Sequence, residues 1–68
     1  MEFHVDGMTC AHCVRAITQA LREVDPQALV QVDLAGKRVS VQGAISVERG
    51  VAAIADAGYI ARPLADAG

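Results

Sequence analysis

The sequence predicts an α+β fold in which two helices cover one face of a four-stranded antiparallel sheet. Apolar residues recur with a period of two in four short stretches, which is typical of half-buried strands. They recur with helical spacing in two longer stretches placed between those strands. Because 68 residues make only one small domain, the six elements are expected to share a single core.

The first strand and the first helix follow in order from the amino terminus. Phe3 and Val5 alternate with polar neighbours, which predicts a strand with one buried face. From Cys13 onward the apolar spacing is that of a helix. Its apolar stripe is expected to hold Val14, Ile17, Leu21 and Val24. Asp25-Pro26 is expected to end this helix, because the residue before a proline is pushed out of the helical region.

The middle of the chain predicts a β-hairpin. Apolar and polar side chains alternate over residues 28–34, with Leu34 on the same side as Val30, and again around Val39 and Val41. Ala35-Gly36 between the two stretches is a turn signal. Because the gap is so short, the two strands are expected to be antiparallel neighbours.

The second helix has a start signal and a stop signal. Ser46 is expected to be its N-cap, and Gly58 is placed to end it in a left-handed cap. Gly50 lies inside the helix, where it costs about 1 kcal/mol relative to alanine. The apolar stripe is expected to hold Val47, Val51, Ile54 and Ala55.

The last strand completes the fold. Residues 59–64 form it, and Pro63 fits a strand end or a sheet edge, where no amide donor is required. Residues 65–68 are expected to be frayed. The resulting βαββαβ order is the split βαβ, or ferredoxin-like, architecture.

Composition and charge narrow the range of functions. A net charge of -2 gives no electrostatic basis for binding nucleic acid or an anionic membrane. No apolar run approaches the roughly 18 residues of a membrane span. The first six residues also lack the regions of a signal peptide, so a cytoplasmic protein is expected. The sequence holds no serine–histidine–acid set, paired carboxylates or phosphate loop, which predicts a binding protein and not an enzyme.

The strongest chemical signal is the pair Cys10 and Cys13. In a reducing cytosol, such a pair is more often metal-binding or catalytic than a structural disulfide. The pair lies where the first strand leads into the first helix. Unpaired amides and a partial positive charge at a helix start favour thiolate over thiol. Cys13 is expected to gain most from this position and Cys10 to be more exposed. Serine at either position is expected to leave the fold nearly unchanged, because the pair lies on a loop.

Two thiolates select soft metal ions, with Cu(I) first and Zn(II) next. A structural zinc site normally has four ligands. The remaining local candidates are few: His12, and at most Asp6 or His4. Two thiolates suffice for Cu(I), and the open coordination sphere lets a partner add a thiolate during transfer. A carrier of Zn(II), Cd(II) or Hg(II) is the alternative among binding proteins.

A thiol oxidoreductase is the alternative from another class. Redox enzymes of the thioredoxin type also place a CxxC pair at a helix start. In this chain no aromatic residue directly precedes the pair and no proline lies inside it, and the chain is short. These features favour metal binding over redox catalysis.

The stretch Gly7-Met8-Thr9-Cys10-Ala11-His12-Cys13 resembles the GMTCxxC loop of heavy-metal-associated (HMA) domains. Such domains occur as bacterial copper chaperones of the CopZ type and as modules of metal-transporting P-type ATPases. The βαββαβ order and the Gly58-Tyr59 step also match, so residues 1–68 resemble a single domain of this kind. The resemblance implies that Cys10 and Cys13 bind Cu(I). It also implies transfer to a like-folded domain of a copper-transporting P-type ATPase, or to a copper sensor.

Several neighbours are candidates for auxiliary roles. By resemblance, Met8 packs under the loop as an anchor and is not a thioether ligand. Thr9 stands where zinc-selective relatives often carry aspartate, which favours Cu(I). His12 is a third ligand, a proton-dependent switch near neutral pH or, as we favour, an exposed residue that adjusts local charge. Tyr59 either tunes the thiolates or simply fills the end of the core. Arg15 could help to dock an acidic partner.

Two expectations concern the context of the chain. Its start at Met1 and its end soon after the last strand favour a free-standing protein over a module of an ATPase. Because the metal site is open, two copies could share copper across their loops as a metal-dependent homodimer. Neither nucleic-acid binding nor membrane insertion is expected.

Overall fold

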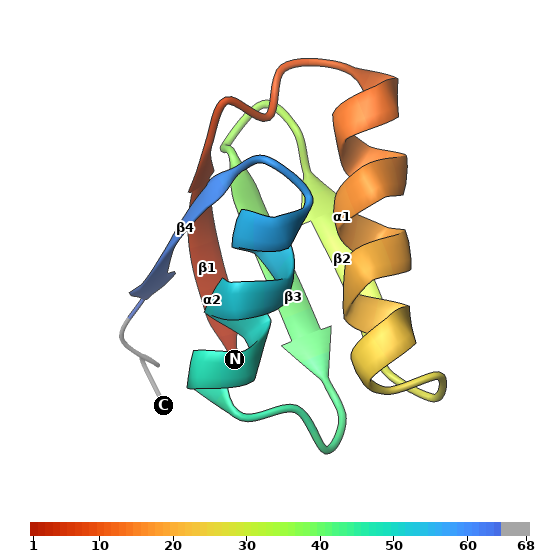
Figure 1. Cartoon of the computed structure of the whole chain (residues 1–68). Helices are drawn as coiled ribbons and strands as arrows, with labels where there is room; N and C mark the ends of the chain where they lie inside the picture. Colours follow the sequence, from red (N-terminus) through yellow and green to blue (C-terminus); the bar gives the residue numbers. More distant parts are fainter. Residues whose placement is uncertain (65–68) are drawn as a thin grey trace.

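The computed structural model describes residues 1–64 and confirms the βαββαβ order (Figure 1). The elements are β1 (Glu2–Asp6), α1 (Ala11–Val24), β2 (Leu29–Asp33), β3 (Arg38–Gln42), α2 (Val47–Asp56) and β4 (Ile60–Leu64). The strands form one antiparallel sheet in the order β2-β3-β1-β4, and both helices cover one face of it. The predicted ferredoxin-like architecture is therefore confirmed. The expectation of frayed ends at residues 65–68 lies outside the described residues.

The core lies between the sheet and the two helices. Phe3 and Val5 are fully buried on β1, and Ile17 and Leu21 are fully buried on α1. The other buried hydrophobic residues are Met8, Cys13, Ala28, Val39, Val41, Ile45, Ala53, Ile54 and Ala61. The inward faces predicted for the first and third strands are thus confirmed.

Helix α1 begins two residues before Cys13, where the predicted apolar spacing starts. Cys10 is the N-cap and Ala11 the first helical residue, because the exposed first turn leaves no apolar signal in the sequence. The prediction for Val24 was wrong, since its side chain is 37% exposed at the last turn, beyond the packed part of the helix. Across residues 1–64, no helix has the length and apolar character that a membrane crossing requires.

The inward face of α2 differs from the predicted stripe. Val47 and Ala55 are exposed, whereas Gly50 and Ala53 are buried. The small residues face the sheet because the aromatic ring of Phe3 occupies the space there. A Cβ atom built on Gly50 would lie 2.7 Å from Cζ of Phe3. The glycine that weakens the helix locally is therefore the residue that makes room for the largest core side chain.

The hairpin is present, but its outer strand packs loosely. β2 and β3 pair as antiparallel neighbours, as predicted. β2 is an edge strand, and Val30 and Val32 are only partly buried against the core. Leu34 was expected on the inner side of the strand. It is 38% exposed instead, because β2 ends at Asp33 and Leu34 belongs to the turn.

Both ends of α2 match their sequence signals. The Ser46 hydroxyl accepts a hydrogen bond from the backbone N–H of Arg49 at 3.2 Å. Gly58 adopts a φ of 100°, and its N–H donates to the carbonyl of Ala55 at 2.9 Å. The N–H of Tyr59 donates to the carbonyl of Ile54 at 3.1 Å, which completes a Schellman cap. This cap sets the direction in which Tyr59 leaves the helix.

The final strand also fits its prediction. β4 is the second edge strand of the sheet, and Pro63 lies in it opposite Phe3 of β1. A proline is tolerated there because an edge strand leaves some amide positions without a partner strand.

Candidate metal-binding site

The loop between β1 and α1 is held by two residues. Gly7 has a φ of 87°, a backbone conformation that residues with a side chain rarely adopt, and it turns the chain out of β1. The next side chain, Met8, is fully buried in the core. Its burial supports the interpretation of an anchor under the loop and leaves the thioether sulfur enclosed by other core residues.

Cys10 and Cys13 lie side by side at the start of α1. Their Sγ atoms are 3.2 Å apart, and both thiols are free. The carbonyl of Cys10 accepts hydrogen bonds from the N–H groups of Cys13 at 3.0 Å and Val14 at 3.3 Å, so the helix fixes the backbone of the pair. Cys10 is exposed and its side chain makes no capping bond, whereas Cys13 is only 7% exposed.

The surroundings of Cys13 favour its thiolate. A hydrogen bond from the Tyr59 hydroxyl is the largest cause that lowers the pKa of Cys13, from 9.0 to about 6. The backbone N–H of Thr9 and the side chain of Cys10 lower this pKa further, and burial opposes them. The same contact raises the pKa of Tyr59, because the hydroxyl proton is held against the thiolate. Cys13 is therefore mostly deprotonated at neutral pH and ready to bind a cation.

Tyr59 reaches the pair from the other end of the chain. It is half-buried, and a Cβ atom on Gly7 would lie 3.6 Å from its ring carbon Cδ1. The ring thus lies against the start of the metal loop, at the end of the molecule where that loop meets the turn before β4 (Figure 1). The sequence left open whether Tyr59 tunes the thiolates or fills the core, and its contact with Cys13 favours the first interpretation.

Three other auxiliary candidates are exposed. Thr9 acts on Cys13 through its backbone N–H, a contribution that its side-chain identity could not predict. His12 lies between the cysteines in sequence and faces solvent. Over residues 1–64, no three histidine, cysteine, aspartate or glutamate side chains converge as a metal-binding group. Arg15 is also exposed, within the same helix.

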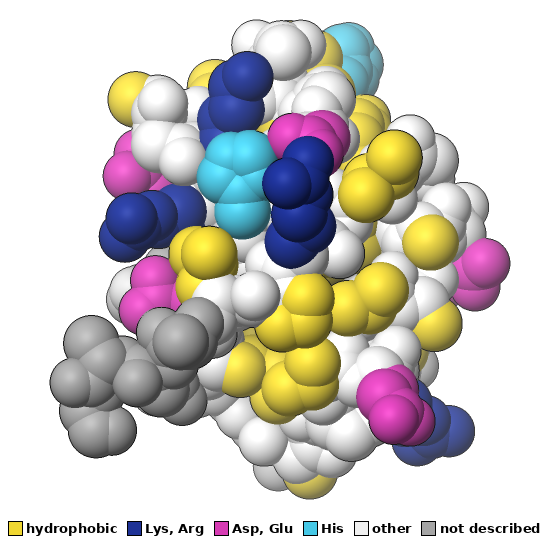
Figure 2. All heavy atoms as spheres, turned by 90° about the vertical axis from the view of Figure 1, so that its left-hand side faces the viewer, with side chains coloured by type: hydrophobic (Ala, Val, Ile, Leu, Met, Phe, Trp, Pro, Cys, Tyr) yellow, Lys and Arg dark blue, Asp and Glu magenta, His cyan; other side chains and the backbone are white. Residues whose placement is uncertain are grey.

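His4 and Asp6 belong to a separate cluster on the sheet. Nδ1 of His4 lies 3.5 Å from Oδ1 of Asp6, and Nη2 of Arg62 donates to Oδ2 of Asp6 at 2.9 Å. Figure 2 shows a histidine side chain beside basic and acidic ones on this side of the molecule. The Asp6 carboxylate is thereby directed toward Arg62. Sequence reasoning missed Arg62, because only the register of β1 and β4 places it opposite His4.

Replacing Tyr59 with phenylalanine is expected to raise the pKa of Cys13, because the largest cause of its lowered value is removed. The rate at which iodoacetamide alkylates Cys13 at pH 6 is then expected to fall about threefold or more. Peptide mass spectrometry after timed alkylation between pH 5 and 9 separates Cys13 from Cys10. An identical pH profile in the variant and the parent protein would show that the hydroxyl does not act on the thiolate.

The lowered pKa also predicts how stability depends on pH. The folded pKa of Cys13 is about 6 and its ordinary value is 9.0, so between these values the unfolded chain binds more protons. The free energy of unfolding of the metal-free, reduced protein is therefore expected to rise from pH 6 to pH 9. Urea denaturation at several pH values measures this slope. The slope is expected to be smaller in Cys13→Ser, and an equal slope in that variant would contradict the assignment.

Comparisons with known proteins agree with this geometry. The sequence profile of the heavy-metal-associated domain matches residues 2–59. "Copper chaperone CopZ" of Staphylococcus aureus is 37% identical over 59 residues, which cover 82% of this chain and 87% of that protein. "Copper-transporting ATPase 1" of Rhizobium meliloti is 41% identical over 63 residues, which cover 90% of this chain but only 8% of the ATPase.

The fold has a close match among solved structures. The copper chaperone Atx1 from Synechocystis PCC6803, solved in a Cu2 form, superposes with a TM-score of 0.88. The two proteins are 37% identical, and the match covers 91% of this chain and 98% of Atx1. The family profile spans most of the chain, and the 37% identity to CopZ covers most of that protein as well. The chain therefore belongs to the heavy-metal-associated domain family.

Proposed function

We propose that this protein is a cytoplasmic carrier of Cu(I), which it binds between the thiolates of Cys10 and Cys13. The observation that carries the proposal is the 3.2 Å approach of the two sulfur atoms at the start of α1. Thiolates are soft ligands and select Cu(I) among the common metal ions of the cell. The similarity to copper chaperones of the CopZ and Atx1 types supports the same ion.

The two cysteines are expected to play different roles in metal binding and release. Metal–sulfur bonds of about 2.3 Å place two tetrahedral ligands about 3.8 Å apart, and linear ligands further apart. The sulfurs must therefore separate from 3.2 Å when a metal enters. Exposed Cys10 has room to move, whereas buried Cys13 is held by Tyr59 and the loop. A partner thiolate would thus displace Cys10 first and Cys13 last.

The described donor set favours Cu(I) over Zn(II). Zinc sites in proteins usually have four ligands, or three with an open position. In the part of the chain that the structure describes, no histidine or carboxylate joins the two cysteines as a third ligand. His12 is exposed, and Asp6 is directed toward Arg62. A carrier of Zn(II), Cd(II) or Hg(II) remains the alternative that the metal titration below tests.

The partner we propose is a like-folded domain of a copper-transporting P-type ATPase, or a copper sensor. The similarity to both a chaperone and an ATPase supports a family in which donor and acceptor share one fold. We assign residues 1–68 to one heavy-metal-associated domain that acts as a metal carrier without catalytic activity. The similarity to CopZ supports a carrier, and the similarity to a segment of a copper-transporting ATPase leaves a module of such an ATPase as the alternative. Because the site is open, copper shared between two loops could also give a metal-bridged homodimer.

The test is an anaerobic titration of the reduced protein with Cu(I) against a chromophoric chelator, with Zn(II) titrated in parallel. One tightly bound Cu(I) per chain and much weaker Zn(II) are expected. The chain has one tyrosine and no tryptophan, so the fluorescence of Tyr59 reports metal at the loop independently. Tighter Zn(II) binding would replace copper with zinc as the cargo. Catalytic turnover of a disulfide substrate without tight metal binding would instead establish a thiol oxidoreductase.

A further inference from the structure

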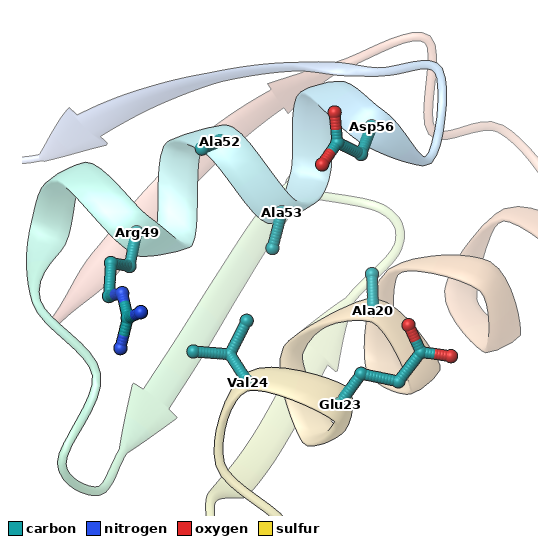
Figure 3. Close-up of a pocket in the computed structure, with 7 residues that line it drawn as sticks. All are labelled: Ala20, Glu23, Val24, Arg49, Ala52, Ala53 and Asp56. Carbon is teal, nitrogen blue, oxygen red and sulfur yellow. The ribbon is translucent and has the colours of Figure 1, made fainter.

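A groove runs between α1 and α2 on the outer surface of the helix layer (Figure 3). Its volume is about 420 Å³, and none of its lining residues belongs to the metal loop. The lining residues are Ala20, Glu23, Val24, Arg49, Ala52, Ala53 and Asp56. The groove thus combines small apolar side chains, which let another backbone approach closely, with three charged side chains.

Helix α2 carries charges at both ends of this groove. Arg49 lies in the first turn of the helix, and Asp56 is its last residue. Figure 3 shows their side chains at opposite ends of the groove, with the alanines between them. The ion pairs found within residues 1–64 involve Asp6 with His4 and with Arg62, so neither Arg49 nor Asp56 has a charged partner there.

The positions of these two charges are unfavourable with respect to the dipole of helix α2. A helix is stabilised by negative charge near its start and by positive charge near its end. Arg49 and Asp56 have the reverse arrangement, whereas Glu48, beside Arg49 in the first turn, is placed favourably. Both side chains are exposed, so they are available to pair with charges on another molecule.

The charge pattern is complementary to itself. Two α2 helices that pack antiparallel, with their centre between Ala52 and Ala53, place Arg49 of each copy opposite Asp56 of the other. Both residues lie on the same stretch of helix, about 10 Å apart along the axis, so the two pairs form together. A two-fold axis is the commonest symmetry of protein dimers and requires this kind of self-complementary surface.

We propose that the groove between α1 and α2 binds a second copy of this chain. The α2 helix of each copy lies in the groove of the other, and Arg49–Asp56 pairs form at both ends. The alanines and the exposed Val24 then lie in the contact. The exposed apolar surface is small, so a weak dimer is expected.

This dimer differs from one that shares copper. The end of α2 leads through Gly58 to Tyr59, so it marks the end of the molecule that carries the cysteines. Antiparallel α2 helices hold the two cysteine pairs at opposite ends of the dimer. Both metal sites stay open to partners, and association requires neither metal nor thiolate. Association of two copies and Cu(I) binding are therefore independent properties that can be tested separately.

The experiment is sedimentation equilibrium of the full chain, reduced and with a metal chelator present, from 10 µM to 1 mM. The weight-average mass is expected to rise above the 7.1 kDa of the monomer. Arg49→Asp and Asp56→Arg are each expected to weaken association about tenfold, because like charges then meet across the axis. The double variant restores opposite charges and is expected to recover most of the affinity. Either single change suits the helix dipole better, so unfolding does not explain a loss.

Two controls complete the test. Lys37→Asp makes the same charge change in the exposed turn between β2 and β3, away from the groove, and is expected to leave association unchanged. Cys10→Ser with Cys13→Ser is also expected to leave it unchanged. A mass of 7.1 kDa throughout the concentration range would overturn the proposal. Equal weakening by Lys37→Asp, or association that requires the cysteines, would also overturn it.

Discussion

Replacing Cys10 or Cys13 with serine is expected to abolish tight Cu(I) binding. A hydroxyl is a hard, neutral ligand at neutral pH and cannot replace a soft thiolate. The loss is expected to exceed the roughly 100-fold effect of removing a residue that merely supports a metal ligand. The described part of the chain also brings no other ligand set to the loop that could compensate. The measurement is the anaerobic competition titration applied to each variant.

The two variants are expected to differ in stability. Both cysteines were expected on a loop, where serine would change the fold little, but Cys13 lies in the first turn of α1 and is buried. Cys13 is buried in the core cluster, so a serine hydroxyl there costs about 1 to 3 kcal/mol. Exposed Cys10 can be replaced at little cost. Urea denaturation of the metal-free variants separates the two effects.

The outcome that would contradict the two-thiolate site is specific. Tight binding of one Cu(I) by either single variant would mean that another residue completes the site. The double variant then serves as the control. If it also bound tightly, the cysteine pair would not be the site.

Replacing Gly50 with valine is expected to destabilise the fold by about 2 kcal/mol, because a side chain there collides with the ring of Phe3. The distance of 2.7 Å from a Cβ atom at position 50 to Cζ of Phe3 is too short for any side chain. The ring is fully buried and has little room to move aside. For a domain of this size the loss corresponds to a fall in Tm of about 10 °C.

Thermal denaturation with a matched control tests this prediction. Ala55→Val places the same side chain on the exposed side of the same helix and is expected to cost only about 0.6 kcal/mol. Phe3→Leu replaces the ring with a shorter side chain and is expected to be less harmful in the Gly50→Val background than alone. If Gly50→Val were no worse than Ala55→Val, the ring would not be packed against the glycine as described.

The sequence by itself determined the features that depend on neighbouring residues. The order of the six elements follows from local apolar periods, and the helix caps at Ser46 and Gly58 follow from the conformations that those residues favour. The CxxC pair at a helix start likewise lies within one short segment. These features can be predicted without knowledge of the fold, because their physical causes act over a few bonds or one helical turn.

Tertiary structure alone decided which distant residues meet. Three contacts join β1 or the start of α1 to the second half of the chain: Tyr59 with Cys13, Phe3 with Gly50, and Asp6 with Arg62. They depend on strand register and on the rotation of α2 about its axis. A local pattern fixes neither quantity. Both are set by how the side chains of the whole core fill the space between sheet and helices.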